Sequence, residues 1–198
     1  MKRRRIALWS TIVGMAALCP GARAQPIYIE FLQGDLSDNH AAPSLLTVHQ
    51  GSNELLGFMA GDLGGGLIDR DYFRFTVPEG MVLSQIILTQ YFSIDPVAFL
   101  AVVPGPAFPH DGETTLPSEL LGWVHLGEEH LGLDIMPLMG MQGQGFTPPL
   151  PSGEYSFWAQ QLGEPTDYVL NFVVEVPAPY GLFALAPIGL IRRRRPRS

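Results

Sequence analysis

The sequence predicts an all-β protein, an antiparallel β-sandwich or jelly roll of about eight or nine strands, between two terminal segments of different character. Two observations predict this fold class. Apolar and polar residues alternate in several short runs of the central segment, residues 25–175, as they do in strands with one face in the core. In addition, 22 glycines and 18 prolines indicate many turns, and no amphipathic helical window of useful length occurs.

Three runs alternate with the period of two that a strand requires. We expect the residues on one side of each run to face the core of the domain. These residues are Ile27, Ile29 and Phe31 in the first run, Phe73, Phe75 and Val77 in the second, and Tyr168, Leu170, Phe172 and Val174 in the third.

Two further runs, residues 82–91 and 97–103, are apolar almost throughout, which predicts strands that are buried on both faces. Turn-forming sequences separate the runs, among them Pro78-Glu79-Gly80 and Pro151-Ser152-Gly153. Short strands between such turns are typical of an antiparallel sandwich, and residues 25–175 are enough for one domain of ordinary size.

The charges are segregated along the chain. The segment 25–176 contains two basic residues, Arg70 and Arg74, and all 19 acidic residues, so two positive charges against nineteen negative ones give it a net charge of −17. Such a surface repels a phosphate backbone, which argues against nucleic acid as a partner. It suits contact with divalent cations, or the simpler role of keeping an exported domain soluble.

The first 24 residues have the layout of a secretory signal peptide. A positive segment, Lys2 to Arg5, precedes an apolar run over residues 6–18 that is too short for a permanent membrane span. Ala22 and Ala24 then supply the small residues that precede a cleavage site, so we expect cleavage before Gln25.

Residues 176–198 combine three segments of different chemistry. The motif Val176-Pro177-Ala178-Pro179 is followed by an apolar run over residues 180–191 and by the basic cluster Arg192, Arg193, Arg194 and Arg195. As a helix the apolar run reaches about 18 Å, short of a hydrocarbon core of about 30 Å. This predicts a transient inner-membrane anchor whose arginines stay on the cytoplasmic side. A frayed, solvated tail is the alternative.

This tail resembles the PEP-CTERM sorting signal of Gram-negative bacteria. The resemblance rests on the proline motif, the apolar segment and the arginine cluster, in that order and paired with a signal peptide. It implies that exosortase, a membrane protease-transpeptidase, recognises the proline motif, in a species that makes exopolysaccharide. The family's usual glutamate is replaced by Ala178, which is closer to variants with a small residue between the prolines.

A second resemblance covers parts of the central segment. The stretch from Asp69 to Gly80, DRDYFRFTVPEG, resembles the first signature of the bacterial pre-peptidase C-terminal domain. Residues 152–157 and 168–172 resemble the closing strands of that domain. The resemblance implies a small β-sandwich that is attached to secreted proteins and is not itself catalytic.

No pattern typical of a catalytic centre occurs in the sequence. It has no G-x-S-x-G nucleophile elbow, its histidines are scattered, and its one cysteine, Cys19, lies in the predicted signal peptide. We therefore predict a non-enzymatic protein without catalytic residues, and a hydrolase is the least supported class. A pair of carboxylates about 5–9 Å apart at a concave surface would revive that class.

Two groups of residues offer the hard oxygen ligands that calcium prefers. The first group is Asp35, Asp38 and Asn39, and the second is Asp62, Asp69 and Asp71, which cluster around glycines. We favour the neighbourhood of Asp69 and Asp71. The alternative is that these aspartates form ordinary turns.

Trp158 is the candidate residue for glycan binding. It falls on the same strand face as Ser156 and Gln160, opposite Tyr155 and Phe157, so we expect it to be exposed and able to stack on a sugar ring. The alternative is that it packs against a loop or a second layer.

Together these features predict an exported, non-enzymatic protein of the cell surface or extracellular matrix. Its expected role is structural or adhesive, in association with exopolysaccharide, and a module that binds a specific glycan or calcium is the alternative. The expected partners are an exosortase-like membrane protease, the inner membrane during export, and exopolysaccharide.

Overall fold

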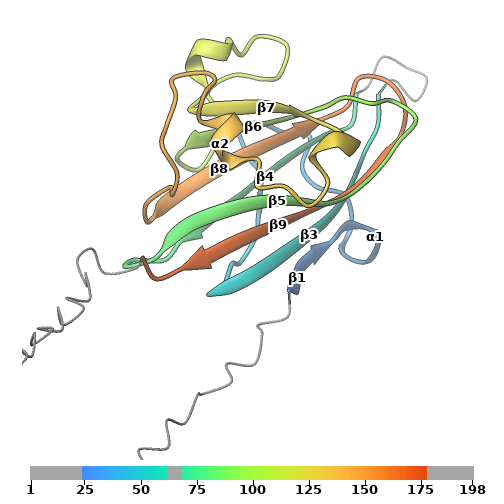
Figure 1. Cartoon of the computed structure of the whole chain (residues 1–198). Coiled ribbons are helices and arrows are strands. Elements are labelled where there is room, and N and C mark those ends of the chain that lie inside the picture. Colours follow the sequence, from blue (N-terminus) through green and yellow to red (C-terminus); the bar gives the residue numbers. More distant parts are fainter. Residues whose placement is uncertain (1–23, 62–67, 178–198) are drawn as a thin grey trace, which may run out of the picture.

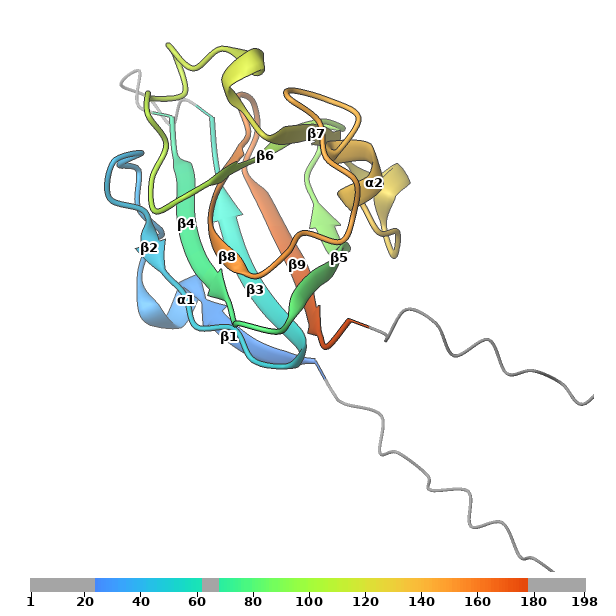
Figure 2. The ribbon, with the colours of Figure 1, turned by 90° about the vertical axis from the view of Figure 1, so that its left-hand side faces the viewer.

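The computed structural model describes residues 24–61 and 68–177, which form two β-sheets packed face to face (Figure 1, Figure 2). The first sheet has the strand order β1 (Gln25–Ile29), β3 (Gly51–Met59), β9 (Thr166–Glu175) and β5 (Val82–Phe92). The second has the order β2 (Ser44–Leu45), β4 (Arg70–Val77), β8 (Gly153–Gln160), β6 (Ala98–Pro104) and β7 (Gly122–Leu126). The predicted all-β sandwich of about eight or nine strands is confirmed.

Helical structure in the described residues is confined to single turns in the connections. These turns are α1 (Glu30–Gln33), η1 (Pro117–Glu119), η2 (Glu128–His130) and α2 (Met136–Met139). Over the ranges 24–61 and 68–177, none of the helices has the length and apolar character needed to cross a membrane.

The long strands pair antiparallel, as predicted. In one sheet β9 lies between β3 and β5, and in the other β8 lies between β4 and β6. Two of the four edge pairs, β1 with β3 and β2 with β4, are parallel instead. The first four strands alternate between the sheets, so β1 and β3 run in one direction and β2 and β4 in the other. The sequence did not predict this alternation.

Four phenylalanines form the centre of the core between the sheets. Phe157 of β8 stacks on Phe73 and Phe75 of β4, with ring centroids 5.3 and 5.0 Å apart. Phe172 of β9, in the opposite sheet, meets Phe75 edge to face at 5.1 Å. All four side chains are fully buried. The predicted inward faces of the second and third alternating runs are therefore confirmed.

The first alternating run departs from the prediction. Strand β1 ends at Ile29, and the chain turns into α1, so that Glu30 is buried whereas Phe31 is 96% exposed. The carboxylate of Glu30 causes the departure, because it accepts hydrogen bonds from the backbone of Leu36 and Phe58 inside the fold. A strand continuing through Phe31 would have pointed this carboxylate outward.

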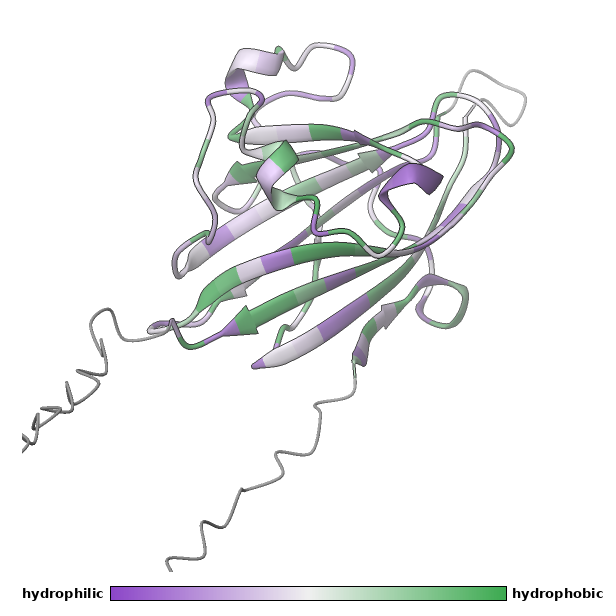
Figure 3. Ribbon diagram, viewed as in Figure 1, coloured by the Kyte–Doolittle hydropathy of each residue, from purple (hydrophilic) through white to green (hydrophobic). Residues whose placement is uncertain are grey.

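The two apolar runs differ in their burial. The run 97–103 gives β6, which is buried on both faces, as predicted. The run 82–91 gives β5, which alternates instead, with Leu83 and Ile86 buried and Gln85 exposed. Strand β5 lies at the edge of its sheet and has two register shifts, and the residues between its buried positions are exposed or half-buried. Figure 3 shows the resulting alternation of apolar and polar segments along β5 and β9.

The two ends of the described chain leave the sandwich at the same end of the four-stranded sheet. Gln25 pairs with Asn53, which in turn pairs with Phe172, three residues before β9 ends. Ala24, Gln25, Val176 and Pro177 are the residues of the predicted terminal signals that lie within the described ranges. Ala22, Ala178, Pro179, the apolar run 180–191 and Arg192 to Arg195 lie outside the described residues.

Removing the central ring of the core tests this packing. We expect Phe157→Ala to lower the free energy of unfolding by about 3–5 kcal/mol, because it loses buried apolar area and leaves a cavity between the sheets. The matched control is Phe92→Ala on β5, where the ring is 73% exposed, with an expected loss within about 0.5 kcal/mol. Urea denaturation measures both values, and an equal loss in the two variants would contradict the assignment of the core.

Candidate metal centre

Three carboxylates from different parts of the chain converge at one end of the sandwich. Glu30 begins α1, Asp35 lies in the loop after it, and Asp71 is the second residue of β4. One carboxylate oxygen from each of the three lies within 4.8 Å of the other two. We call these three residues the acidic triad.

Asp71 is the innermost member of the triad. It lies on the same face of β4 as Phe73, points between the sheets and is fully buried. Its Oδ2 accepts a hydrogen bond of 2.5 Å from the hydroxyl of Tyr168 on β9. Its Oδ1 finds no hydrogen-bond partner among the described residues. An unpaired oxygen on a buried carboxylate is costly, so this position favours either a proton or a bound cation.

The hydroxyl of Tyr168 reaches Asp71 because a glycine lies opposite it in the sheet. Gly57 of β3 pairs with Tyr168, and a Cβ added to Gly57 would lie 2.3 Å from the tyrosine ring. A side chain at this position would displace the ring. The glycine therefore fixes the orientation of Tyr168, and through it that of the Asp71 carboxylate.

Glu30 is held by the backbone on two sides. Its Oε1 accepts a hydrogen bond of 2.7 Å from the N–H of Leu36, and its Oε2 accepts one of 2.5 Å from the N–H of Phe58. These bonds tie the loop after α1 to β3. Asp35, in contrast, is exposed, so the triad is buried on one side and open to solvent on the other.

Two further aspartates add negative charge near the triad. Asp69 is partly buried, and its Oδ1 has no hydrogen-bond partner among the described residues. Asp38 accepts a hydrogen bond from the backbone N–H of Arg70, while the side chain of Arg70 extends to Gln160 and Glu113. The guanidinium of Arg70 is thus committed to other partners.

The pKa values of the buried carboxyls are raised in consequence. Burial, followed by a hydrogen bond with Asp35, raises the pKa of Glu30 to about 7. Burial and the nearby charges of Asp35 and Asp38 raise the pKa of Asp69 to about 6. For Asp71, burial and the charge of Glu30 raise the pKa well above its ordinary value. The folded chain therefore favours a proton or a metal cation at this end of the sandwich.

The arrangement suits a hard divalent cation. Each carboxylate oxygen has two lone pairs, so those of Glu30 and Asp71 that accept one hydrogen bond can still coordinate a metal. Calcium accepts irregular sets of six to eight oxygens, including water. A cavity of about 260 Å³ adjoins Glu30 and Asp35 and is lined also by Phe31, Phe58 and Asp167, so water can reach the open side.

The calcium site expected from the sequence stays a prediction, and the structure shows where its residues lie. Asp71 belongs to the triad, Asp69 lies near enough to influence it, and Asp62 lies outside the described residues. Asp35, from the less favoured group, is the second member. Glu30 was missed because it was assigned to the outer face of a strand. The signal that could have found it is an acidic residue within the apolar run 27–32.

Trp158 lies on the predicted face of β8, away from the core of the sandwich, but the expectation that it is exposed is wrong. Its side chain is 5% exposed. Tyr72 stacks on it at 5.8 Å, and Phe99 and Phe108 meet it edge to face at 4.9 and 6.1 Å. Tyr72 and Phe99 come from the outer faces of β4 and β6, and Phe108 comes from the loop after β6. The plane of Trp158 is therefore not a free platform for a sugar ring.

A scan against protein-family models and a search of the curated proteins found no match for this chain. The resemblances of the tail and of the central segment stay predictions from the sequence.

The raised pKa values predict an unusual dependence of stability on pH in the presence of a chelator. The native carboxyls hold their protons to higher pH than the unfolded ones, so unfolding releases protons between about pH 4.5 and 7. The free energy of unfolding should then fall, on the order of 2 kcal/mol, as the pH rises through this window. Thermal unfolding across the window measures it, and a stability that rises with pH would contradict it.

Proposed function

We propose that this chain is an exported, non-enzymatic protein of the cell surface or extracellular matrix, structural or adhesive among exopolysaccharide, whose sandwich binds calcium. The observation that carries the calcium assignment is the unpartnered Oδ1 of the buried Asp71, at the centre of the acidic triad. Among the described residues the two arginines have other partners, because Arg70 extends to Gln160 and Glu113, and Arg74 pairs with Glu154.

Calcium is the cation that the triad suits best. The ligands come from a strand, a helical turn and an exposed loop, so they form an irregular set rather than the regular octahedron that magnesium demands. All three are oxygens, which disfavours zinc and other metals that prefer nitrogen or sulfur. Modules outside the cell bind calcium at about 10⁻⁴–10⁻³ M, a range that a partly open site of three carboxylates can reach.

The same geometry disfavours hydrolysis at the triad. Although its carboxylates lie close together, both oxygens of Glu30 accept backbone hydrogen bonds, and Asp71 is fully buried. A general acid or a nucleophile must reach its substrate, and neither group is free to do so. Carboxylates held in this way can share lone pairs with a cation without moving.

A cation at the triad would strengthen the fold where its charge repulsion is greatest. It would join α1, the loop at Asp35 and β4 of the opposite sheet. Association with polysaccharide and export to the surface rest on the sequence, through the signal peptide, the acidic composition and the sorting-like tail. A calcium-dependent domain fits such a destination, because calcium is more abundant outside cells than inside them.

Calcium should stabilise the protein through Asp71. At a calcium concentration about 100 times its Kd, we expect the melting temperature to rise by roughly 5–10 °C over its value in chelator. In Asp71→Asn this rise should vanish, while the melting temperature in chelator should increase because one repelling charge is gone. Asparagine can still accept the hydrogen bond of Tyr168.

The matched control for this experiment is Glu79→Gln, which removes one charge at an exposed turn between β4 and β5. It should keep the full calcium response. The calcium assignment fails if wild-type protein melts at the same temperature in calcium and in chelator, or if Asp71→Asn responds as the wild type does.

The export route is tested by the intact mass and the location of the mature protein in its host. We expect a product that begins at Gln25, ends near Val176 and is found in the matrix, because both terminal signals are then removed. A product that retains Arg192 to Arg195 in the inner membrane would contradict sorting and indicate a plain anchor.

A further inference from the structure

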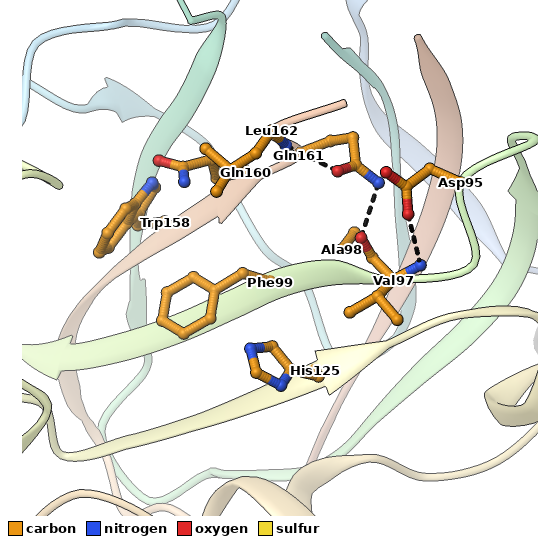
Figure 4. Close-up of a pocket in the computed structure, with 9 residues that line it drawn as sticks. All are labelled: Asp95, Val97, Ala98, Phe99, His125, Trp158, Gln160, Gln161 and Leu162. Carbon is orange, nitrogen blue, oxygen red and sulfur yellow. Dashed lines mark hydrogen bonds between the residues drawn. The ribbon is translucent and has the colours of Figure 1, made fainter. Parts of the chain in front are cut away.

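A second hollow lies on the outer face of the five-stranded sheet (Figure 4). Its volume is about 400 Å³. The floor is a row of side chains from adjacent strands, in which Phe99 of β6 pairs with Gln160 of β8 on one side and with His125 of β7 on the other. Asp95 and Leu162, from the loops beside these strands, form its rim. We call this hollow the outer pocket.

The outer pocket has an apolar side. The ring of Phe99 is partly exposed, and it is held in place edge to face by Trp158 at 4.9 Å and by His125 at 6.0 Å. Leu162 is 64% exposed at the rim. An aromatic ring fixed in this way, with an aliphatic side chain beside it, can cover the C–H face of a sugar ring.

The outer pocket also has polar groups that are held in position. The side-chain oxygen of Gln160 accepts a hydrogen bond of 2.7 Å from Arg70 Nε. This bond fixes the amide, and Gln160 lines the pocket (Figure 4). The amide nitrogen of Gln160 is thus a positioned donor.

Asp95 supplies the acceptor. Its Oδ1 accepts a hydrogen bond of 3.1 Å from the N–H of Val97, which orients the carboxylate. A Cβ added to Gly163 would lie 2.3 Å from the Oδ2 of Asp95. The glycine therefore leaves room for the carboxylate at the rim. A fixed donor on one side and a fixed acceptor on the other match the hydroxyl groups of a sugar, each of which both donates and accepts.

We propose that the outer pocket binds a neutral sugar unit of a polysaccharide. The C–H face of the sugar packs on Phe99 and Leu162, and its hydroxyls bond to the amide of Gln160 and the carboxylate of Asp95. A volume of about 400 Å³ is at the small end of ligand sites, which suits one or two sugar rings. Trp158 thus contributes by holding Phe99 in place and not through its covered plane.

The preference for a neutral sugar follows from the charges. Asp95 lies at the rim, and the guanidinium of Arg70 is bonded to Gln160 and Glu113. A uronate or a sulfated sugar would meet an acceptor of its own charge, and both arginines among the described residues already have acidic partners. This inference rests on the proposed association with polysaccharide and names the class of sugar involved.

The test uses the processed protein purified from its host, titrated with cellotetraose, mannotetraose and galactotetraose while tryptophan fluorescence and heat are recorded. We expect saturable binding of at least one of these neutral probes. In Gln160→Glu the oxygen that bonds Arg70 is kept, while the amide donor becomes a charged acceptor, so binding should weaken at least about tenfold. The matched control, Gln85→Glu on the exposed face of β5, should bind as the wild type does.

A second variant distinguishes a loss of sugar binding from a folding defect. Leu162→Asp alters an exposed loop residue and leaves the core untouched, and it should weaken binding by a similar factor with an unchanged melting temperature. The proposal is overturned if none of the three neutral probes binds, if both variants bind as the wild type does, or if tetragalacturonate binds more tightly than galactotetraose. Calcium binding and export have separate readouts, so such a failure leaves them unaffected.

Discussion

The contact between phenylalanines of opposite sheets is the interaction on which the rest of the structure depends. Phe73 and Phe75 stack against Phe157 within one sheet, and Phe172 closes on them from the other. Because side chains alternate along a strand, this inward packing also decides what the same strands present outward. Strands β4 and β8 hold Phe73 and Phe157 inside, so they present Tyr72 and Trp158 outside, where a second apolar cluster forms.

The acidic triad lies at the end of the same packing. Asp71 precedes Phe73 on the inner face of β4, and Tyr168 precedes Phe172 on the inner face of β9. The packing that buries the aromatic core therefore also buries the carboxylate of Asp71. The orientation of that carboxylate depends on Gly57, which leaves room for the ring of Tyr168. Burial of charge without a basic partner costs free energy. Carboxylate ligands beside a cavity are the arrangement in which a cation can offset that cost.

The sequence was sufficient to predict the parts of the fold that depend on local pattern. The period of two placed Phe73, Phe75 and Phe172 correctly, and it also gave the face of Trp158. It could not show what covers that face, because Phe108 comes from a loop about fifty residues earlier in the chain. Asp71 was predicted as a calcium ligand because Asp62 and Asp69 lie near it in the sequence. Glu30 was not predicted. Its inward turn depends on Phe58, which is distant in the sequence.

Both ends of the described chain leave the sandwich at the same side, and this arrangement has a mechanical consequence. Strand β9 runs ten residues, about 33 Å, from the end that holds Tyr168 to the end that leads into Pro177. The acidic triad and the outer pocket both lie at the first of these ends, since Gln160 pairs with Arg70, next to Asp71. If the protein is attached through its C-terminal segment, both sites lie at the end of the sandwich opposite the point of attachment.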